Sequence, residues 1–285
     1  MSLIKKAEDL PVKKIIIGAI YGQPGIGKST MALSMPKPLL LDTDNGILRV
    51  QADYRCDSVP VENYQNILDV LKEDLSAYET IVIDTLGKLV DFMCEKIAQD
   101  NPNLVQKDGT MSIKMWGIVK NEFKNFLTIV QKMNKNLIFV AHEKESTEND
   151  VRIIRPDVSG SAGKDIIKDL DFLGYVEMVG KKRSISFTPS NKFYAKNSLQ
   201  LDGYIEIPTL TSNDANTFLT DYILKPTIEH RKNEIKRLKE NSEKMQKAIE
   251  LVNKLGDTKE CRDKLNSLGL NNVQVLKIKD LLQKK

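Results

Sequence analysis

The chain has 285 residues, of which 41% are hydrophobic and 29% are charged, with a net charge of +4. This balance is typical of a folded globular protein and excludes an extensively disordered chain. No apolar run approaches the roughly 20 residues of a transmembrane helix, and no signal-peptide core stands at the amino-terminus. We therefore expect a cytoplasmic protein that does not bind a membrane.

Cysteine and histidine are too sparse for a metal site built on soft ligands. The three cysteines, Cys56, Cys94 and Cys261, have neither metal-ligand spacing nor the pattern of a disulfide framework. His142 and His230 are the only histidines. Any bound metal should therefore be a hard cation with oxygen ligands.

The positive charge is concentrated in the last part of the chain. Residues 225–285 contain 16 Lys and Arg against 9 Asp and Glu, a net charge of +7, which leaves 27 basic and 30 acidic residues before them. A basic tail can bind nucleic-acid phosphates through electrostatics, or it can simply be a solvated helix surface. Base stacking is not expected in the tail, because aromatic residues are sparse there and Tyr222 stands just before it.

The first half of the chain alternates short apolar runs with helical patterns. We expect strands at residues 15–21, 39–42, 58–61, 80–84 and 136–141, and helices at residues 29–35, 64–75, 86–99 and 114–134. Apolar runs of this length between helices predict an α/β fold with a mostly parallel sheet covered on both faces.

The pattern changes after His142. Residues 143–162 are polar and predict a long loop or an irregular hairpin, and a short helix is expected near 163–170. In three later segments apolar and polar residues alternate, which predicts antiparallel strands at the carboxyl-terminal edge of the sheet. These segments are 173–179, 183–188 and 203–207. Residues 208–216 have the composition of a linker.

The tail is predicted to be helical from about Ile228. Its apolar residues fall largely on heptad positions a and d, at Ile228, Ile235, Leu238, Met245, Ile249 and Val252. Gly256 is suited to end this helix, and residues 257–260 resemble a capping box for a second one. The stripe is explained either by a helical hairpin packed on itself or on the core, or by oligomerisation. We expect two domains, at residues 1–222 and 223–285.

A glycine-rich loop between the first strand and the first helix carries the strongest functional signal. It reads Gly22-Gln23-Pro24-Gly25-Ile26-Gly27-Lys28-Ser29, followed by Thr30. Such a loop turns backbone N–H groups toward phosphates. Lys28 is expected to reach the β and γ phosphates, and the Ser29 hydroxyl is expected to ligate Mg²⁺. The predicted cofactors are ATP and Mg²⁺.

A second metal ligand is expected at the end of a neighbouring buried strand. Asp84 ends the run Ile81–Asp84 and is predicted to hold Mg²⁺, although it could instead only cap the following helix. Thr85 follows, so the Asp-Glu pair typical of the AAA+ class is missing. Asn191-Lys192 is followed by Phe-Tyr, so no guanine-reading Asn-Lys-x-Asp motif is formed. Both absences disfavour AAA+ machines and classical GTPases.

These elements together resemble the RecA/RadA-like P-loop ATPases of phages and prophages, some of which act in recombination or single-strand annealing. The resemblance covers about residues 14–207. It rests on the glycine loop and on Asp42-Thr43-Asp44, Ile83-Asp84-Thr85, Val140-Ala141-His142 and Phe193-Tyr194-Ala195-Lys196. A RecA-like P-loop core with a carboxyl-terminal helical extension is the implied fold.

The resemblance implies roles for three further residues. Asp44 takes the place where the family often has a catalytic glutamate, with Asp42 as its competitor; the alternative is an Asp-Asn-Gly turn closed by residues 44–46. His142 is implied as a γ-phosphate sensor that begins a DNA-binding loop. Lys196 is implied to reach the nucleotide of a neighbouring subunit in a ring or filament.

These features favour ATP hydrolysis in DNA recombination or single-strand annealing. The expected partners are single-stranded DNA and further copies of the chain. An ATP-switched assembly or loader protein without base contacts remains an alternative. A nucleotide or small-molecule kinase is disfavoured because Arg152, Arg155 and Arg183 are scattered and form no compact lid.

Overall fold

A computed structural model of the chain describes residues 4–106, 111–148, 151–160, 162–211 and 214–283. The chain divides into two compact units. The core unit comprises Lys14–Thr227, and the helical unit comprises Met1–Lys13 together with Ile228–Lys285. The expected domain boundary at residues 222 and 223 lies in the helical turn Thr220–Leu224, just before this division.

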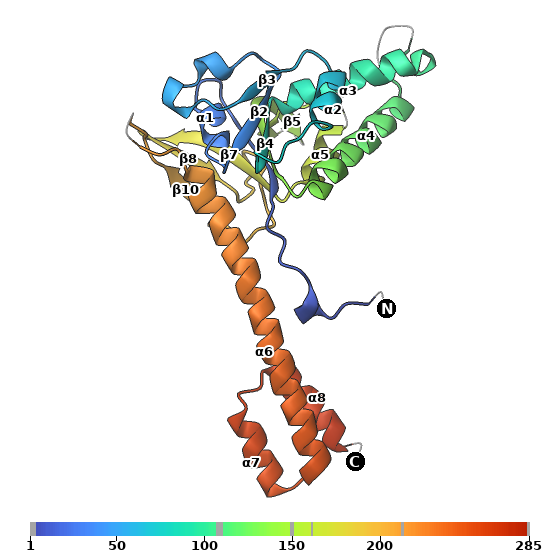
Figure 1. The fold of residues 1–285 in the computed structure, drawn as a ribbon, viewed down its shortest axis with the longest axis vertical. Coiled ribbons are helices and arrows are strands. Elements are labelled where there is room, and N and C mark those ends of the chain that lie inside the picture. Colours follow the sequence, from blue (N-terminus) through green and yellow to red (C-terminus); the bar gives the residue numbers. More distant parts are fainter. Residues whose placement is uncertain (1–3, 107–110, 149–150, 161, 212–213, 284–285) are drawn as a thin grey trace. The chain divides into compact units, whose positions relative to one another are not determined.

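The core unit is built on one sheet with the order β10-β8-β7-β1-β5-β4-β2-β3 (Figure 1). The strands are β1 (Ile17–Gly22), β2 (Pro38–Asp42), β3 (Ser58–Pro60), β4 (Thr80–Asp84), β5 (Asn136–Glu148), β6 (Val151–Pro156), β7 (Phe172–Val179), β8 (Lys182–Ser186), β9 (Lys196–Asn197) and β10 (Tyr204–Ile207). The six strands from β7 to β3 run parallel. At the edge, β8 pairs antiparallel with β7, and β10 pairs antiparallel with β8. The predicted α/β class with an antiparallel edge is confirmed. The segment 173–179 was expected to be an antiparallel strand, but β7 also pairs in parallel with β1.

Five helices accompany the sheet within the described part of the core unit. They are α1 (Lys28–Ala32), α2 (Tyr64–Val70), α3 (Leu86–Asp100), α4 (Ile113–Lys132) and α5 (Ala162–Asp169). Asn63 begins α2 and Ser112 begins α4, each by accepting a hydrogen bond from a backbone N–H group of the first turn. The helices α1 and α2 end earlier than their apolar patterns predict.

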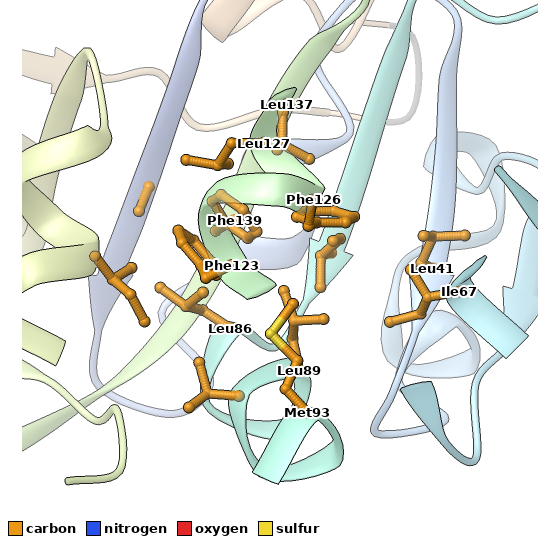
Figure 2. Packing of buried hydrophobic residues seen from close by; sticks show 14 of the residues in the cluster. Leu41, Ile67, Leu86, Leu89, Met93, Phe123, Phe126, Leu127, Leu137 and Phe139 are labelled. Atoms are coloured by element: carbon orange, nitrogen blue, oxygen red, sulfur yellow. The ribbon is translucent and has the colours of Figure 1, made fainter. Parts of the chain in front are cut away.

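The main hydrophobic core lies between one face of the sheet and the helices α2, α3 and α4. Alternate strand residues such as Leu41, Leu137 and Phe139 point into it, as the two-residue period of a strand requires. Figure 2 shows Phe123 and Phe126 of α4 beside Phe139, and their ring centroids lie 5.7 to 6.4 Å apart. The intervening strand residues, among them Ile138 and Val140, are also buried, so both faces of the sheet are covered.

The strand β5 is longer than its apolar run. It was expected to end at Ala141, but it continues to Glu148 and pairs with antiparallel β6, with Glu143 opposite Pro156. The hairpin, one of the two expectations for this polar segment, is therefore the one that forms. The apolar pattern stops where the strand leaves the core, because residues of the hairpin outside the core need not be apolar.

The helical unit contains α6 (Lys225–Leu255, whose first three residues belong to the core unit), α7 (Lys259–Ser267) and α8 (Asn272–Gln283). Gly256 follows α6 with φ of 57°, the left-handed conformation that favours glycine. The residue that begins α7 is Thr258, which accepts from Cys261 N, rather than the expected Asp257.

Part of the heptad stripe packs within the helical unit itself. Met245, Ile249 and Val252 of α6 form a cluster with Leu265 of α7 and Ile278 of α8. This confirms, for that half of α6, the expectation of helices packed on one another. Among the described residues no helix has both the length and the apolar content that crossing a bilayer requires.

Candidate active site

The glycine loop follows β1 and leads into α1. Gly22 lies so close to β7 that an added Cβ would come within 2.3 Å of Val176 O, and Gly27 has φ of 92°. No side chain among the described residues caps α1 at Gly27. The first N–H groups of the helix therefore remain for a ligand, and oxyanions are the ligands that such groups prefer.

The ammonium group of Lys28 is held inside this loop. It is buried, and Nζ donates to Gly22 O at 2.9 Å and to Gln23 O at 2.7 Å. Burial lowers the pKa of Lys28, and the nearby carboxylates of Asp84 and Glu143 oppose this shift. A phosphate beside Nζ would favour the charged form further, so the lysine is suited to offset phosphate charge.

Ser29 and Asp84 lie together where the metal was expected. Ser29 Oγ donates to Asp84 Oδ2 at 2.5 Å. Burial raises the pKa of Asp84; the Ser29 hydrogen bond opposes this, and the negative charges of Asp44 and Asp42 add to it. A cation at this place would stabilise the carboxylate, which fits Mg²⁺ with its preference for oxygen ligands. Asp84 does not cap α3, because Thr85 does so by accepting from Lys88 N.

Thr43 fixes the position of Asp84. Its hydroxyl donates to Asp84 O at 2.9 Å and accepts from Thr85 N at 2.7 Å. Its own backbone N–H also donates to Asp84 O at 2.8 Å. The ends of β2 and β4 are thereby joined, and the backbone that carries the metal ligand is held at three points.

The two candidate bases after β2 have different surroundings. Asp42 is only 3% exposed, and its carboxylate accepts from the N–H groups of Asp44, Gly46 and Ile47 at 2.8 to 3.2 Å. The expected turn therefore exists, but Asp42 closes it rather than Asp44. The side chain of Asp44 is 25% exposed, and its Oδ2 lies 3.7 Å from Nε2 of His142.

His142 lies in β5, the strand between β1 and β4. Its Cα is in register with Gly22, the last residue of β1. Asp84, the last residue of β4, is in register with Val140, two residues before His142. Ligands of open α/β sheets bind at this carboxyl edge. Lys28, Ser29, Asp84, Asp44 and His142 are thus brought together there. His142 was expected to begin a loop after the strand, and the correction is that the strand runs on through His142 into the hairpin.

Lys196 is not brought to this site. It lies in β9 beside Leu173 of β7, and Nζ donates to Lys168 O, near the carboxyl end of α5, at 2.6 Å. Leu173 is in register with Ala19, which precedes the glycine loop in β1. Within one chain, Lys196 therefore holds α5 and does not contact the loop.

Two residues near the loop were missed by sequence reasoning. Glu143 accepts a hydrogen bond from Tyr175 OH at 3.2 Å and acts electrostatically on Lys28. Its signal in the sequence was its position directly after His142. Arg183 of β8 donates to Ile26 O at 3.4 Å. No local signal distinguished Arg183, because the two residues are far apart in the sequence.

The fold and the site together define a P-loop nucleotide-binding protein. Residues 14–199 match the profile of a protein family described as an AAA domain. The match covers more than half of the chain, and the chain belongs to this family of P-loop ATPases. No curated protein matches the chain.

Proposed function

We propose that the chain binds ATP with Mg²⁺ and hydrolyses it at the carboxyl edge of the sheet. The observation that carries this proposal is the convergence of Lys28, Ser29, Asp84, Asp44 and His142 beside the glycine loop. Ser29 and Asp84 would hold Mg²⁺ through their oxygen atoms. Lys28 offsets the charge of the transferring phosphoryl group, and a bound Mg²⁺ would supply further positive charge.

Asp44 is the proposed general base for the attacking water. Asp42 is unsuited to that role because three backbone N–H groups already occupy its carboxylate. Asp44 is partly exposed and faces His142 across 3.7 Å. The histidine is placed to bind the γ-phosphate or to orient Asp44. A carboxylate in this role is commonly worth about 10²–10⁴-fold in rate.

The nucleotide site is proposed to control the β5–β6 hairpin. The strand that carries His142 continues directly into this hairpin. Tyr21, the residue before the glycine loop, donates from its hydroxyl to Tyr194 O at 2.5 Å and to Ile154 O of β6 at 3.3 Å. A change at the γ-phosphate therefore has two routes to the hairpin, and ordering of a segment by that phosphate is a known type of switch.

The biological role we propose is DNA recombination or single-strand annealing in a phage context, as the RecA-like resemblance implies. In the hairpin, Lys144 pairs with Asp157 and Arg152 pairs with Glu145. These ion pairs reduce the attraction of the hairpin for phosphates. We therefore propose that the basic tail, with its net charge of +7, supplies the main DNA contact. The same resemblance implies a homo-oligomer in which Lys196 serves the neighbouring subunit.

ATP turnover with and without single-stranded DNA tests this role. Stimulation by DNA is expected, and DNA affinity should be higher with a non-hydrolysable ATP analogue than with ADP. His142→Ala should remove that nucleotide dependence. Replacing three exposed lysines of α6, Lys236, Lys239 and Lys247, by Gln should weaken DNA binding most at low salt and make the affinity less dependent on salt concentration.

Each contrary result points to another function. Turnover that is indifferent to DNA would replace the recombination role by that of an ATP-switched loader. Transfer of phosphate to a small acceptor would instead identify a kinase. No turnover at all, in a folded protein with Mg²⁺, would contradict the ATPase proposal itself.

A further inference from the structure

The heptad stripe of α6 has two halves with different partners. Its second half, Met245, Ile249 and Val252, packs with α7 and α8. The a and d positions of its first half form a seam along the helix, made of Ile228, Arg231, Ile235, Leu238 and Ser242. The seam is mostly apolar, so it is suited to be covered by another element.

Residues 6–13, which we call the strap, lie along this seam within the helical unit. Arg231 Nη1 donates to Lys13 O at 2.8 Å, and Ser242 Oγ donates to Glu8 Oε1 at 2.7 Å. The two polar positions of the seam are thus both bonded to the strap. From Arg231 to Ser242 the helix rises about 16 Å, and an extended chain from Glu8 to Lys13 covers about the same length. The strap therefore runs antiparallel to α6 between these two hydrogen bonds.

The strap does not fill the seam. A groove of about 480 Å³ lies between them, and it is lined by Leu10 and Pro11 of the strap and by Ile235 and Leu238 of α6. Leu10 is 48% exposed and Leu238 is 39% exposed. Well-packed protein interiors have few voids larger than a water molecule, so the strap is a loose cover for an apolar surface. The side chains of a second helix interdigitate with such a stripe and would fill it better.

The charged positions beside the seam favour one orientation of that second helix. Glu234 occupies a g position, Lys232 and Lys239 occupy e positions, and all three are exposed. In a parallel coiled coil of two copies, Glu234 of each helix lies beside Lys239 of the other, so the favourable pair occurs twice by symmetry. An antiparallel pair would instead bring the lysines of the e positions together. Arg231 and Ser242, as polar seam positions, fix the register and weaken the association.

We propose that the seam binds the same helix of a second copy as a parallel, in-register coiled coil, and that the strap covers the seam in the single chain. The helical unit then has two states, one with the strap on the seam and one with the strap displaced by the second copy. Because only a fraction of the molecules has an open seam, the apparent affinity between the copies is reduced. This contact needs neither ATP nor DNA, so it is independent of the contact proposed for Lys196.

Light scattering of the full chain over a range of concentrations, without nucleotide or DNA, tests this competition. Glu8→Ala combined with Leu10→Ser removes one strap hydrogen bond and an apolar contact with the seam. This variant should dimerise severalfold more tightly, because its seam is open more often. Asp9→Asn is the matched control, since Asp9 is an exposed residue of the strap that does not line the groove. A strict monomer in both the wild-type protein and the strap variant would overturn the proposal, and an unchanged affinity in the strap variant would overturn the role of the strap.

A cross-link locates the contact and its orientation. Leu238→Cys places two thiols at facing d positions of a parallel, in-register pair. Mild oxidation with copper phenanthroline should then give a disulfide-linked dimer on a non-reducing gel. Glu240→Cys is the control, because Glu240 is an exposed f position on the opposite side of α6 and should not cross-link. A yield for Leu238→Cys no higher than that of the control would overturn the contact.

A charge exchange tests the same contact without altering the seam. Glu234→Lys should weaken dimerisation severalfold, because it sets a lysine against Lys239 of the second copy. Adding Lys239→Glu to the same chain should restore the wild-type affinity. Failure of this restoration would overturn the parallel pairing.

Discussion

The two units of this chain differ in the range of their polar contacts. In the core unit, Ser29 bonds Asp84 and Arg183 reaches Ile26, so residues far apart in sequence converge. In the helical unit, most ion pairs join residues three to five positions apart, such as Lys264 with Glu260 and Arg262 with Asp257. Convergent contacts define a site, whereas local pairs on exposed helices define only a charged surface. The converging polar groups of this protein therefore lie in the core unit, and the main polar feature of the helical unit is its charged surface.

The largest effect is expected from Lys28→Ala. This change removes the cation that serves both phosphate binding and the developing charge, so turnover should fall by more than about 10³-fold. Circular dichroism should show an intact fold. Lys37→Ala is the control, since Lys37 is an exposed lysine of the same unit that pairs with Glu79. Normal turnover in folded Lys28→Ala protein would refute the phosphate-site assignment.

Asp44→Asn should separate the chemical step from nucleotide binding. We expect near-normal affinity for MgATP and a turnover that is lower by about 10²–10⁴-fold, because the base is lost and the fold of the loop is not. Asp42→Asn should instead lower stability, because it disturbs three backbone hydrogen bonds and destabilises the turn by about 1–3 kcal/mol. A purely kinetic defect in Asp42→Asn, with normal turnover in Asp44→Asn, would reassign the base to Asp42.

Core substitutions test whether the two units are separate in stability. Phe123→Ala should lower the free energy of unfolding of the core unit by about 3–5 kcal/mol, because a fully buried ring leaves a cavity. The only tryptophan, Trp116, stands in α4 and reports this transition through its fluorescence. Leu265→Ala in the helical unit should change the circular dichroism transition and leave the fluorescence transition in place. Equal shifts of both probes in both variants would show that the units unfold as one.

The smallest effect is expected from an exposed ion pair in the core unit. Hydrogen bonds from Lys120 and Lys168 lower the pKa of Asp165 from 3.8 to about 2. A lowered carboxyl pKa stabilises the fold above pH 3.8, and this contribution is lost as the pH falls toward 2. Asp165→Asn should therefore lower the Tm slightly at pH 6 and not at all near pH 2. The exposed Asp169→Asn serves as control, and a difference that grows as the pH falls would contradict this account.

The sequence predicted those parts of the fold and site that depend on local order. The alternation of apolar runs predicted the parallel sheet, and the glycine loop and Asp84 were expected together, as the hydrogen bond from Ser29 to Asp84 shows them. Both patterns could be recognised because strand period and loop chemistry act over a few residues. The choice between Asp42 and Asp44 was not accessible in this way, because it depends on which carboxylate the backbone N–H groups of the turn occupy.

Contacts between distant segments explain what the sequence pattern did not predict. Arg183 had been counted among scattered arginines, yet the pairing of β8 with β7 places it beside the glycine loop. The role of Lys196 toward a neighbouring subunit stays a prediction, and the sequence did not predict that its ammonium donates to Lys168 O within one chain. The apolar pattern could not predict that β5 continues past His142, because a hairpin outside the core has no buried apolar face.

The unbroken course of β5 also has an evolutionary consequence. Residues up to Ala141 are buried on both faces and tolerate little change, whereas most residues beyond His142 in this strand are exposed or only partly buried. Substitutions can therefore accumulate in the outer part of a strand whose inner part stays fixed against β1 and β4. A lineage can therefore change the hairpin without rebuilding the buried strand beside the glycine loop, because one strand contains both a constrained and a permissive segment.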